Sequence, residues 1–158
     1  MKLSDDLFES IIKHCPLISI DFVIKDNNMR VLLGKRKNEP AKGYWFTPGG
    51  RIFKDESITD ACIRILRDEL NIHTTDPNYS IFNITEHFYS NNFYNNDFST
   101  HYINISMTLH DFDINSIVDM TAQHTDIIWL TIPELIRHKN VHFNAKKQFH
   151  EYKFKYVK

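Results

Sequence analysis

The pattern of apolar and polar positions predicts a chain of short strands interleaved with few helices. Apolar runs typical of strands lie at residues 17–24, 30–35, 44–47, 79–89, 100–110 and 127–130. Helices are expected from Ser4 to Pro16, from Ser57 to Leu70, after Pro133, and from about Asn144 to Tyr156. The polar turn at residues 25–29 predicts that the first two strands form a hairpin. This mixture predicts one α/β sandwich domain spanning residues 1–158.

One acidic residue breaks the pattern of the clearest helix, residues 57–70. Its apolar residues recur at helical spacing, and Glu69 falls near the middle of the apolar arc that they form. A carboxylate that points into a core is costly unless it is paired or bound to a cation. Glu69 therefore either bends out to solvent from the last turn of the helix or ligates a metal ion.

The composition of the chain argues against several classes of protein, among them nucleic-acid-binding, membrane-spanning and secreted proteins. The chain has 158 residues and only four glycines, all between Gly34 and Gly50. With 19 basic and 20 acidic side chains, the net charge of −1 does not indicate nucleic-acid binding. No apolar run approaches the roughly 18 residues of a membrane span, and the N-terminus is acidic where a signal peptide would be apolar. Two cysteines do not make a disulfide framework, so we expect a cytoplasmic protein without membrane partners.

The glycine pair Gly49-Gly50 stands just ahead of this helix. Glycine lets a backbone approach a ligand closely, and a backbone oxygen offered there suits a hard cation such as Mg²⁺. Taken alone, such a pair usually forms only a turn. The spacing between this glycine pair and the helix is a more specific signal of function.

Gly50, Glu56 and residues 64–72 are spaced as in the Nudix box, G-x5-E-x7-R-E-U-x-E-E-x-G-U, where U is aliphatic. The chain departs from it at Ile65, Asp68 and Asn71, of which the missing acid at Ile65 is the largest change. This depleted box resembles that of the GDP-mannose mannosyl hydrolase branch of the Nudix superfamily. Further similarity lies at residues 16–22, 32–36, 43–51, 86–89, 92–93, 97–102, 123–124 and 140–142. The resemblance implies the Nudix fold, an α/β/α sandwich with a mixed central sheet.

The resemblance also implies a reaction and a set of site residues. Water would attack the anomeric carbon of GDP-mannose, and of GDP-glucose, with inversion, giving GDP and free sugar. One Mg²⁺, for which Mn²⁺ could substitute, would be held by Gly49, Glu69 and Gln123. The matching catalytic positions are His124 as general base, Arg51 and Arg64 for leaving-group charge, and Tyr102 as a donor. Substrate contacts would come from Leu3, Phe8, Asp21, Arg36 and His87, in a homodimer.

Structural interpretations stand beside these roles. Arg64 could pair with Asp60 or Asp68 on its own helix, and Tyr102 and Phe8 could be core residues. Asp21 and Arg36 could form a salt bridge across the expected hairpin.

Two other functions fit the same fold. One is a Nudix pyrophosphatase that attacks phosphorus, and the other is a non-catalytic nucleotide-binding module. The missing acid at Ile65 favours the module, whereas the joint presence of Glu69, Gln123 and His124 argues against it.

Overall fold

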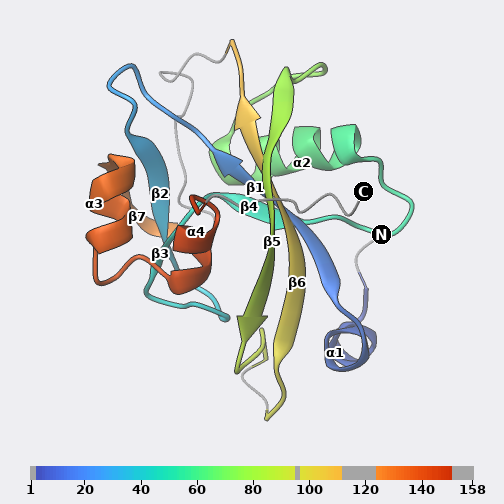
Figure 1. The fold of residues 1–158 in the computed structure, drawn as a ribbon. Helices are drawn as coiled ribbons and strands as arrows, with labels where there is room; N and C mark the ends of the chain where they lie inside the picture. Colours follow the sequence, from blue (N-terminus) through green and yellow to red (C-terminus); the bar gives the residue numbers. More distant parts are fainter. Residues whose placement is uncertain (1–2, 95–96, 112–123, 151–158) are drawn as a thin grey trace, which may run out of the picture.

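Seven strands form two sheets, with helices on either side of them, in the computed structural model, which describes residues 3–94, 97–111 and 124–150 (Figure 1). The strands are β1 (Leu17–Val23), β2 (Val31–Arg36), β3 (Trp45–Phe46), β4 (Gly49–Arg51), β5 (Tyr79–Tyr89), β6 (Thr100–Leu109) and β7 (His124–Leu130). The helices are α1 (Asp5–His14), α2 (Ile58–Leu70), α3 (Ile132–Arg137) and α4 (Phe143–Lys147). None of these helices combines the length and the apolar character needed to cross a membrane.

The larger sheet has the order β4-β1-β6-β5, and the smaller one has the order β3-β2-β7. β1 and β6 run parallel, whereas β1–β4 and β5–β6 are antiparallel, so the larger sheet is mixed. The expected α/β class with a mixed sheet is confirmed.

The expected hairpin between the first two strands is wrong beyond its turn. β1 and β2 belong to different sheets, and they meet only near the turn, through the bridge Lys25–Val31 and the Leu32 N–H bond to the Ile24 carbonyl. β1 is instead the central partner of β4 and β6, and six of its seven residues are buried. Both sides of β1 are therefore taken up by strands that lie far from it in sequence.

Two apolar clusters make a layered core. Ile20 and Phe22 of β1 pack with Leu66 and other residues of α2. On the other side, Leu33 of β2 packs with Leu135 of α3 and with residues around α4. Because strand side chains alternate between faces, Asp21 lies on the opposite face of β1 from Ile20 and Phe22. Asp21 therefore points away from α2.

α2 has the ends that its sequence predicts. The Ser57 hydroxyl accepts from the Asp60 N–H at 3.1 Å. Asn71 ends the helix in the left-handed conformation with φ 55°, which asparagine tolerates.

Three boundaries differ from expectation. Gly49 and Gly50 lie in strand β4 and not in a turn, and His124 begins β7 where a loop was expected. The last helix covers only Phe143–Lys147, and residues 151–158 lie outside the described part of the chain. Gly49, Gly50 and His124 belong to strands because they pair with neighbouring strands, and local sequence patterns do not encode this pairing.

Candidate active site

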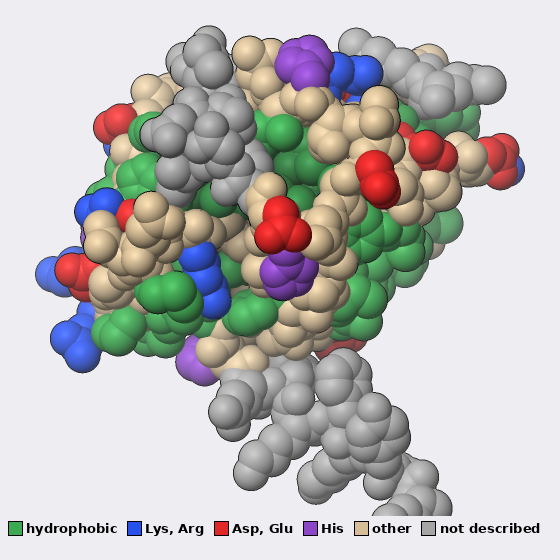
Figure 2. All heavy atoms as spheres, turned by 90° about the horizontal axis from the view of Figure 1, so that it is seen from above, with side chains coloured by type: hydrophobic (Ala, Val, Ile, Leu, Met, Phe, Trp, Pro, Cys, Tyr) green, Lys and Arg blue, Asp and Glu red, His purple; other side chains and the backbone are tan. Residues whose placement is uncertain are grey.

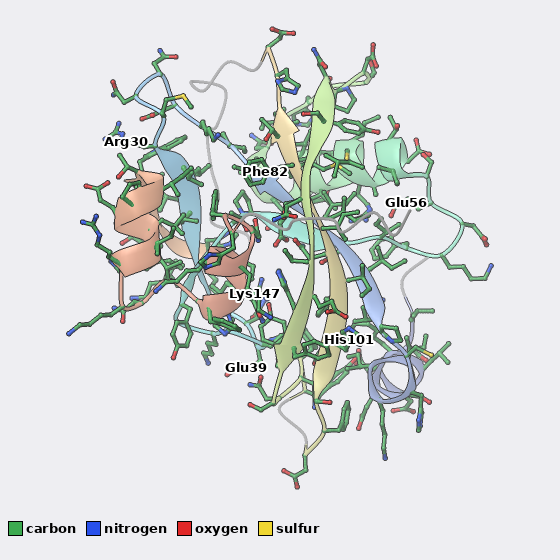
Figure 3. All side chains as sticks on the ribbon, in the orientation of Figure 1. Arg30, Glu39, Glu56, Phe82, His101 and Lys147 are labelled. Atoms are coloured by element: carbon green, nitrogen blue, oxygen red, sulfur yellow. The ribbon has the colours of Figure 1, made fainter. Side chains whose placement is uncertain are left out.

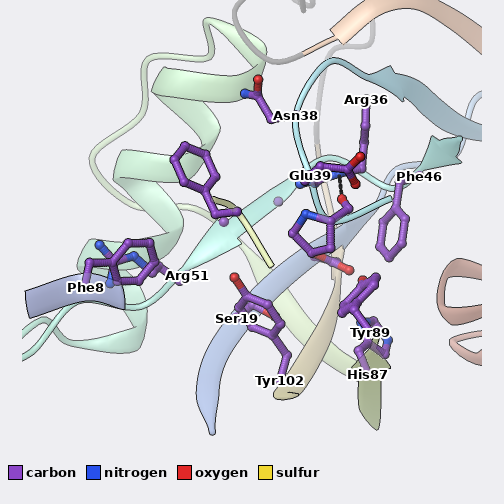
Figure 4. Close-up of a pocket in the computed structure, with 15 residues that line it drawn as sticks. Phe8, Ser19, Arg36, Asn38, Glu39, Phe46, Arg51, His87, Tyr89 and Tyr102 are labelled. Carbon is purple, nitrogen blue, oxygen red and sulfur yellow. Dashed lines mark hydrogen bonds between the residues drawn. The ribbon is translucent and has the colours of Figure 1, made fainter. Parts of the chain in front are cut away.

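A cavity of about 370 Å³ opens on the face of the larger sheet to which Asp21 points. Its walls include the predicted residues Phe8, Asp21, Arg36, Gly49, Arg51, His87 and Tyr102. Figure 4 shows Phe8 and Arg51 at one end of the cavity and Phe46, His87 and Tyr89 at the other. The structure therefore brings together side chains from α1, β1, β2, β4, β5 and β6.

Arg51 supplies positive charge at the first end. Its guanidinium carbon lies 3.9 Å from the ring centroid of Phe8 and 5.0 Å from that of Phe53. Partial burial lowers its pKa, but a guanidinium remains charged at any physiological pH. Within the described part of the chain it forms no salt bridge with a carboxylate. Its charge is thus available to an anionic ligand.

Arg64 has a different position. Its Nε and Nη2 donate to the two carboxylate oxygens of Glu56 at 2.6 and 2.8 Å, and Nη2 also donates to the Arg51 carbonyl at 2.9 Å. The expected alternative partners, Asp60 and Asp68, are not the ones it uses. Arg64 is absent from the cavity wall, so it acts on the site by fixing the backbone of Arg51.

Asp21 lies between the two ends, on β1. Burial raises its pKa to about 7, although the charge of Arg36 and hydrogen bonds from neighbouring side chains act in the opposite direction. The alternative of an Asp21–Arg36 salt bridge is not found, because Arg36 Nε donates instead to the Pro40 carbonyl at 2.9 Å (Figure 4). A side chain at Gly49 would overlap Asp21 Oδ1 and the Ile20 carbonyl, so this position requires glycine for close approach.

His87 closes the other end of the cavity and is only 2% exposed. Its Nε2 lies 2.9 Å from the Thr85 hydroxyl, and its ring meets Phe46 edge-on at 5.9 Å. Burial, with the nearby charges of Lys147 and His142, lowers its pKa to about 3. His87 is therefore neutral at pH 7.

Glu69 does not reach solvent, so that alternative is wrong. The residue is 4% exposed, and its Oε2 is buried with no hydrogen-bond partner among the residues that the structure describes. Burial raises its pKa to about 7, against the opposing charge of Arg36. Ile65, one turn earlier on the same face of α2, packs against Gly50 of β4, so Glu69 faces the strand that contains Gly49.

An unpartnered carboxylate oxygen beside a backbone strand fits a hard cation, which takes oxygen ligands. Among residues 3–94, 97–111 and 124–150, no three His, Cys, Asp or Glu side chains gather into a metal-binding cluster. A site here would therefore hold fewer than three such side chains and take its other ligands from different oxygens, as expected for Gly49 and Glu69. The third expected ligand, Gln123, lies outside the described residues.

His124 and Leu3 lie outside the cavity wall. His124 is 3% exposed and is paired with Arg36 across β2 and β7. Its ring covers Gly34 so closely that a side chain there would overlap it. Leu3 is half-buried ahead of α1. General-base catalysis by His124 and nucleotide contact by Leu3 thus stay predictions.

Several wall residues were not predicted. Phe46 and Tyr89 lie in segments that carry the family resemblance, yet their pattern is equally typical of core strands. Asn38, Glu39 and Phe93 lie in polar loops, where no local pattern distinguishes a wall residue from a surface residue.

The comparisons with known proteins agree with this geometry. The model of the NUDIX domain family matches residues 16–152. The chain belongs to the Nudix family. Nudix hydrolases generally use divalent metals such as Mg²⁺.

Among its relatives, the Nudix chain is 38% identical over 126 residues to the low-salt glycan biosynthesis protein Agl8 of Haloferax volcanii. That match covers 80% of this chain and 78% of the relative. A shorter match, 35% over 57 residues, is to the ADP-ribose pyrophosphatase of Methanocaldococcus jannaschii and covers 36% of this chain and 33% of that one. The MutT protein from Methanosarcina mazei has the same fold, with a TM-score of 0.67 and 19% identity over 85% of this chain and 91% of its own.

Proposed function

We propose that this Nudix protein is a Mg²⁺-dependent hydrolase that cleaves GDP-mannose, and also GDP-glucose, into GDP and free sugar. The observation that carries the proposal is the lone buried carboxylate of Glu69 on a box helix that has apolar Ile65 where Nudix boxes have an acid. A helix with so few carboxylates available as ligands suits the binding of one metal ion rather than several. Substitution at carbon, in which the diphosphate only departs, needs less metal than attack at phosphorus.

In this reaction an oxygen of water bonds to the anomeric carbon from the face opposite the leaving group, so the configuration inverts. The bond between that carbon and the diphosphate oxygen breaks, and its electron pair leaves with GDP. His124 takes the proton of the attacking water as the general base.

The chain's own residues would stabilise the departing GDP. Arg51 offers an uncompensated positive charge, and Tyr102 offers a phenolic donor in the same cavity. Burial raises the pKa of Tyr102, which keeps its hydroxyl protonated. Bound Mg²⁺, held by Gly49, Glu69 and Gln123, would neutralise diphosphate charge.

Nucleotide contacts would come from Leu3 and Phe8 in a cytoplasmic homodimer without nucleic-acid or membrane partners. On the face shown in Figure 2, basic and acidic side chains of the described residues are interspersed. Lys and Arg are matched in number by Asp and Glu, 19 against 20.

The position of bond cleavage tests the proposal. Purified protein is incubated with Mg²⁺ and GDP-mannose in ¹⁸O-water, and the products are weighed by mass spectrometry. We expect the label in the free sugar, and label in phosphate would refute attack at carbon.

His124→Gln should slow turnover by about 10²-fold or more while substrate still binds, and near-normal turnover would exclude His124 as the base.

Attack at phosphorus is the second candidate. It is favoured by the local match to an ADP-ribose pyrophosphatase, which is confined to 57 residues. In the labelling experiment it would give nucleoside monophosphate and a sugar phosphate. A non-catalytic module would bind nucleotide sugars without turnover.

A further inference from the structure

Gln148, just after α4, is a buried amide to which neither the sequence nor the family resemblance assigns a role. It is 1% exposed, and its Nε2 donates to Asp21 Oδ2 and to the Thr47 hydroxyl, both at 2.8 Å. An amide nitrogen has two hydrogens, so both are used. Both of its N–H groups thus donate within the cavity region, one to the Asp21 carboxylate and one to Thr47 beside it.

These contacts orient the Asp21 carboxylate. Oδ2 accepts from Gln148 and, at 3.4 Å, from Thr47, whereas Oδ1 lies against Gly49. Rotation of the carboxylate would break the bond to Gln148 and leave a buried amide hydrogen unpaired. The Asp21 carboxylate is therefore held with one oxygen on Gln148 and Thr47 and the other on the side of Gly49, in the cavity wall.

Gln148 is held in turn by β5. Asn83 Nδ2 donates to the Gln148 carbonyl at 3.0 Å. The preceding helix is tied to the same strand by Lys147 Nζ, which donates to the Glu86 carbonyl at 3.1 Å, and by Asn144 Nδ2, which donates to the Phe88 carbonyl at 3.2 Å. Figure 3 shows Lys147 beside β5. The backbone that carries the Gln148 side chain is thus fixed to β5.

The surroundings of Asp21 indicate what it contacts. A carboxylate repels a diphosphate, whereas Arg51, at the Phe8 end of the cavity, attracts it. The wall at the other end is formed by Phe46, neutral His87 and Tyr89, and the charge of Asp21 contributes to raising the pKa of Tyr89, which places Asp21 near this end. The charge of Arg36 also acts on Asp21. Aromatic walls with one fixed acceptor suit a sugar ring, whose C–H groups pack on aromatic faces and whose hydroxyls donate.

We propose that Gln148 is a positioning residue that holds the Asp21 carboxylate toward the hydroxyl groups of the sugar in a nucleotide-sugar substrate. This proposal rests on the proposed function for the choice of GDP-mannose as ligand. It makes a distinct claim, because Gln148 acts only through Asp21 and only on the sugar part.

The test compares GDP-mannose with GDP, which lacks the sugar. In Gln148→Met, which keeps the length of the side chain and removes both donors, we expect KM for GDP-mannose to rise about tenfold. The inhibition constant of GDP should change by less than about twofold. Gln148→Glu, which offers an oxygen in place of the amide nitrogen, should give the same pattern and serves as a second variant if Gln148→Met fails to fold.

A double-mutant cycle separates positioning from a structural role. In an Asp21→Asn background, Gln148→Met should add no further loss for GDP-mannose. Equal weakening of GDP and GDP-mannose, or additive losses in the cycle, would overturn the proposal. If the wild type does not cleave GDP-mannose, the same ligands are titrated by calorimetry, so failure of the proposed function leaves this test intact. Equal wild-type affinity for the two ligands would also overturn the proposal.

Discussion

The guanidinium of Arg51 stacks on the ring of Phe8, with 3.9 Å between its central carbon and the ring centroid. The contact joins α1 to β4, two elements with different functions in the site. Stacking occupies one face of the guanidinium and leaves its N–H edge for the cavity. Phe8 of α1 thereby orients the positively charged guanidinium of Arg51, which belongs to β4.

Replacing Arg51 should lower activity by a route that depends on geometry as well as on charge. Arg51→Lys keeps the charge but loses the stacked fork, so we expect kcat/KM to fall about tenfold, and Arg51→Ala should lower it about 10²-fold or more. Steady-state kinetics measure both. Lys35→Ala, which changes a cation near Trp45 outside the cavity wall, is the matched control, and an equal loss in that variant would contradict the role of Arg51.

Loss of Arg64 should act first on stability. Its partner Glu56 is half-buried, and removing the guanidinium leaves that carboxylate without its two charged donors. We expect Arg64→Ala to lower the free energy of unfolding by about 1–3 kcal/mol, measured by urea denaturation. Arg67→Ala removes an exposed pair with Asp68 on the same helix and should cost less than about 1 kcal/mol. Equal losses in the two variants would exclude a special role for the Glu56 pair.

The buried carboxyl groups of Asp21 and Glu69 should make the metal-free protein less stable as pH rises. Their pKa values are raised to about 7 in the folded state, above the ordinary values of 3.8 and 4.5. Between about pH 4.5 and 7 these two groups therefore bind more protons in the folded protein than in the unfolded chain. His87 and His142, whose pKa values burial lowers to about 3 and about 4, bind fewer protons when folded and offset this effect below about pH 6. Stability should therefore fall mainly between about pH 6 and 8.

Denaturation of the chelator-treated protein at several pH values measures this slope. Glu69→Gln should remove part of it and weaken Mg²⁺ binding at least about tenfold, as measured by calorimetry. A wild-type stability that is flat or that rises between about pH 6 and 8 would contradict burial of these groups.

Gly34→Ala should destabilise the protein because the new methyl group would overlap the ring of His124. Overpacking of this kind costs about 1–3 kcal/mol, and it should also displace the imidazole and lower turnover. Gly43→Ala meets no atom but has φ 81°, so it should cost only about 1 kcal/mol and leave turnover unchanged. Normal turnover in Gly34→Ala would show that the position of His124 is not important.

Local signals in the sequence were sufficient for α2, and they marked Glu69 as an acid on its apolar face. Ser57 caps the helix, apolar residues recur along one face, and Asn71 accepts the left-handed end, all within one short segment. The same spacing placed Glu69 among buried residues, and the structure confirms that it is buried. These features depend on helix geometry alone, so a chain pattern predicts them.

The sequence by itself determined the α/β class, α2 with its buried Glu69, and the glycines that precede it. Tertiary structure decided which strands pair, which is why β1 and β2 part into two sheets. It also decided that Arg64 pairs with Glu56 and that Gln148 reaches Asp21, 127 residues away in the chain. Contacts between distant segments depend on how the sheets and helices pack against one another. The spacing of residues along one strand or helix does not determine that packing.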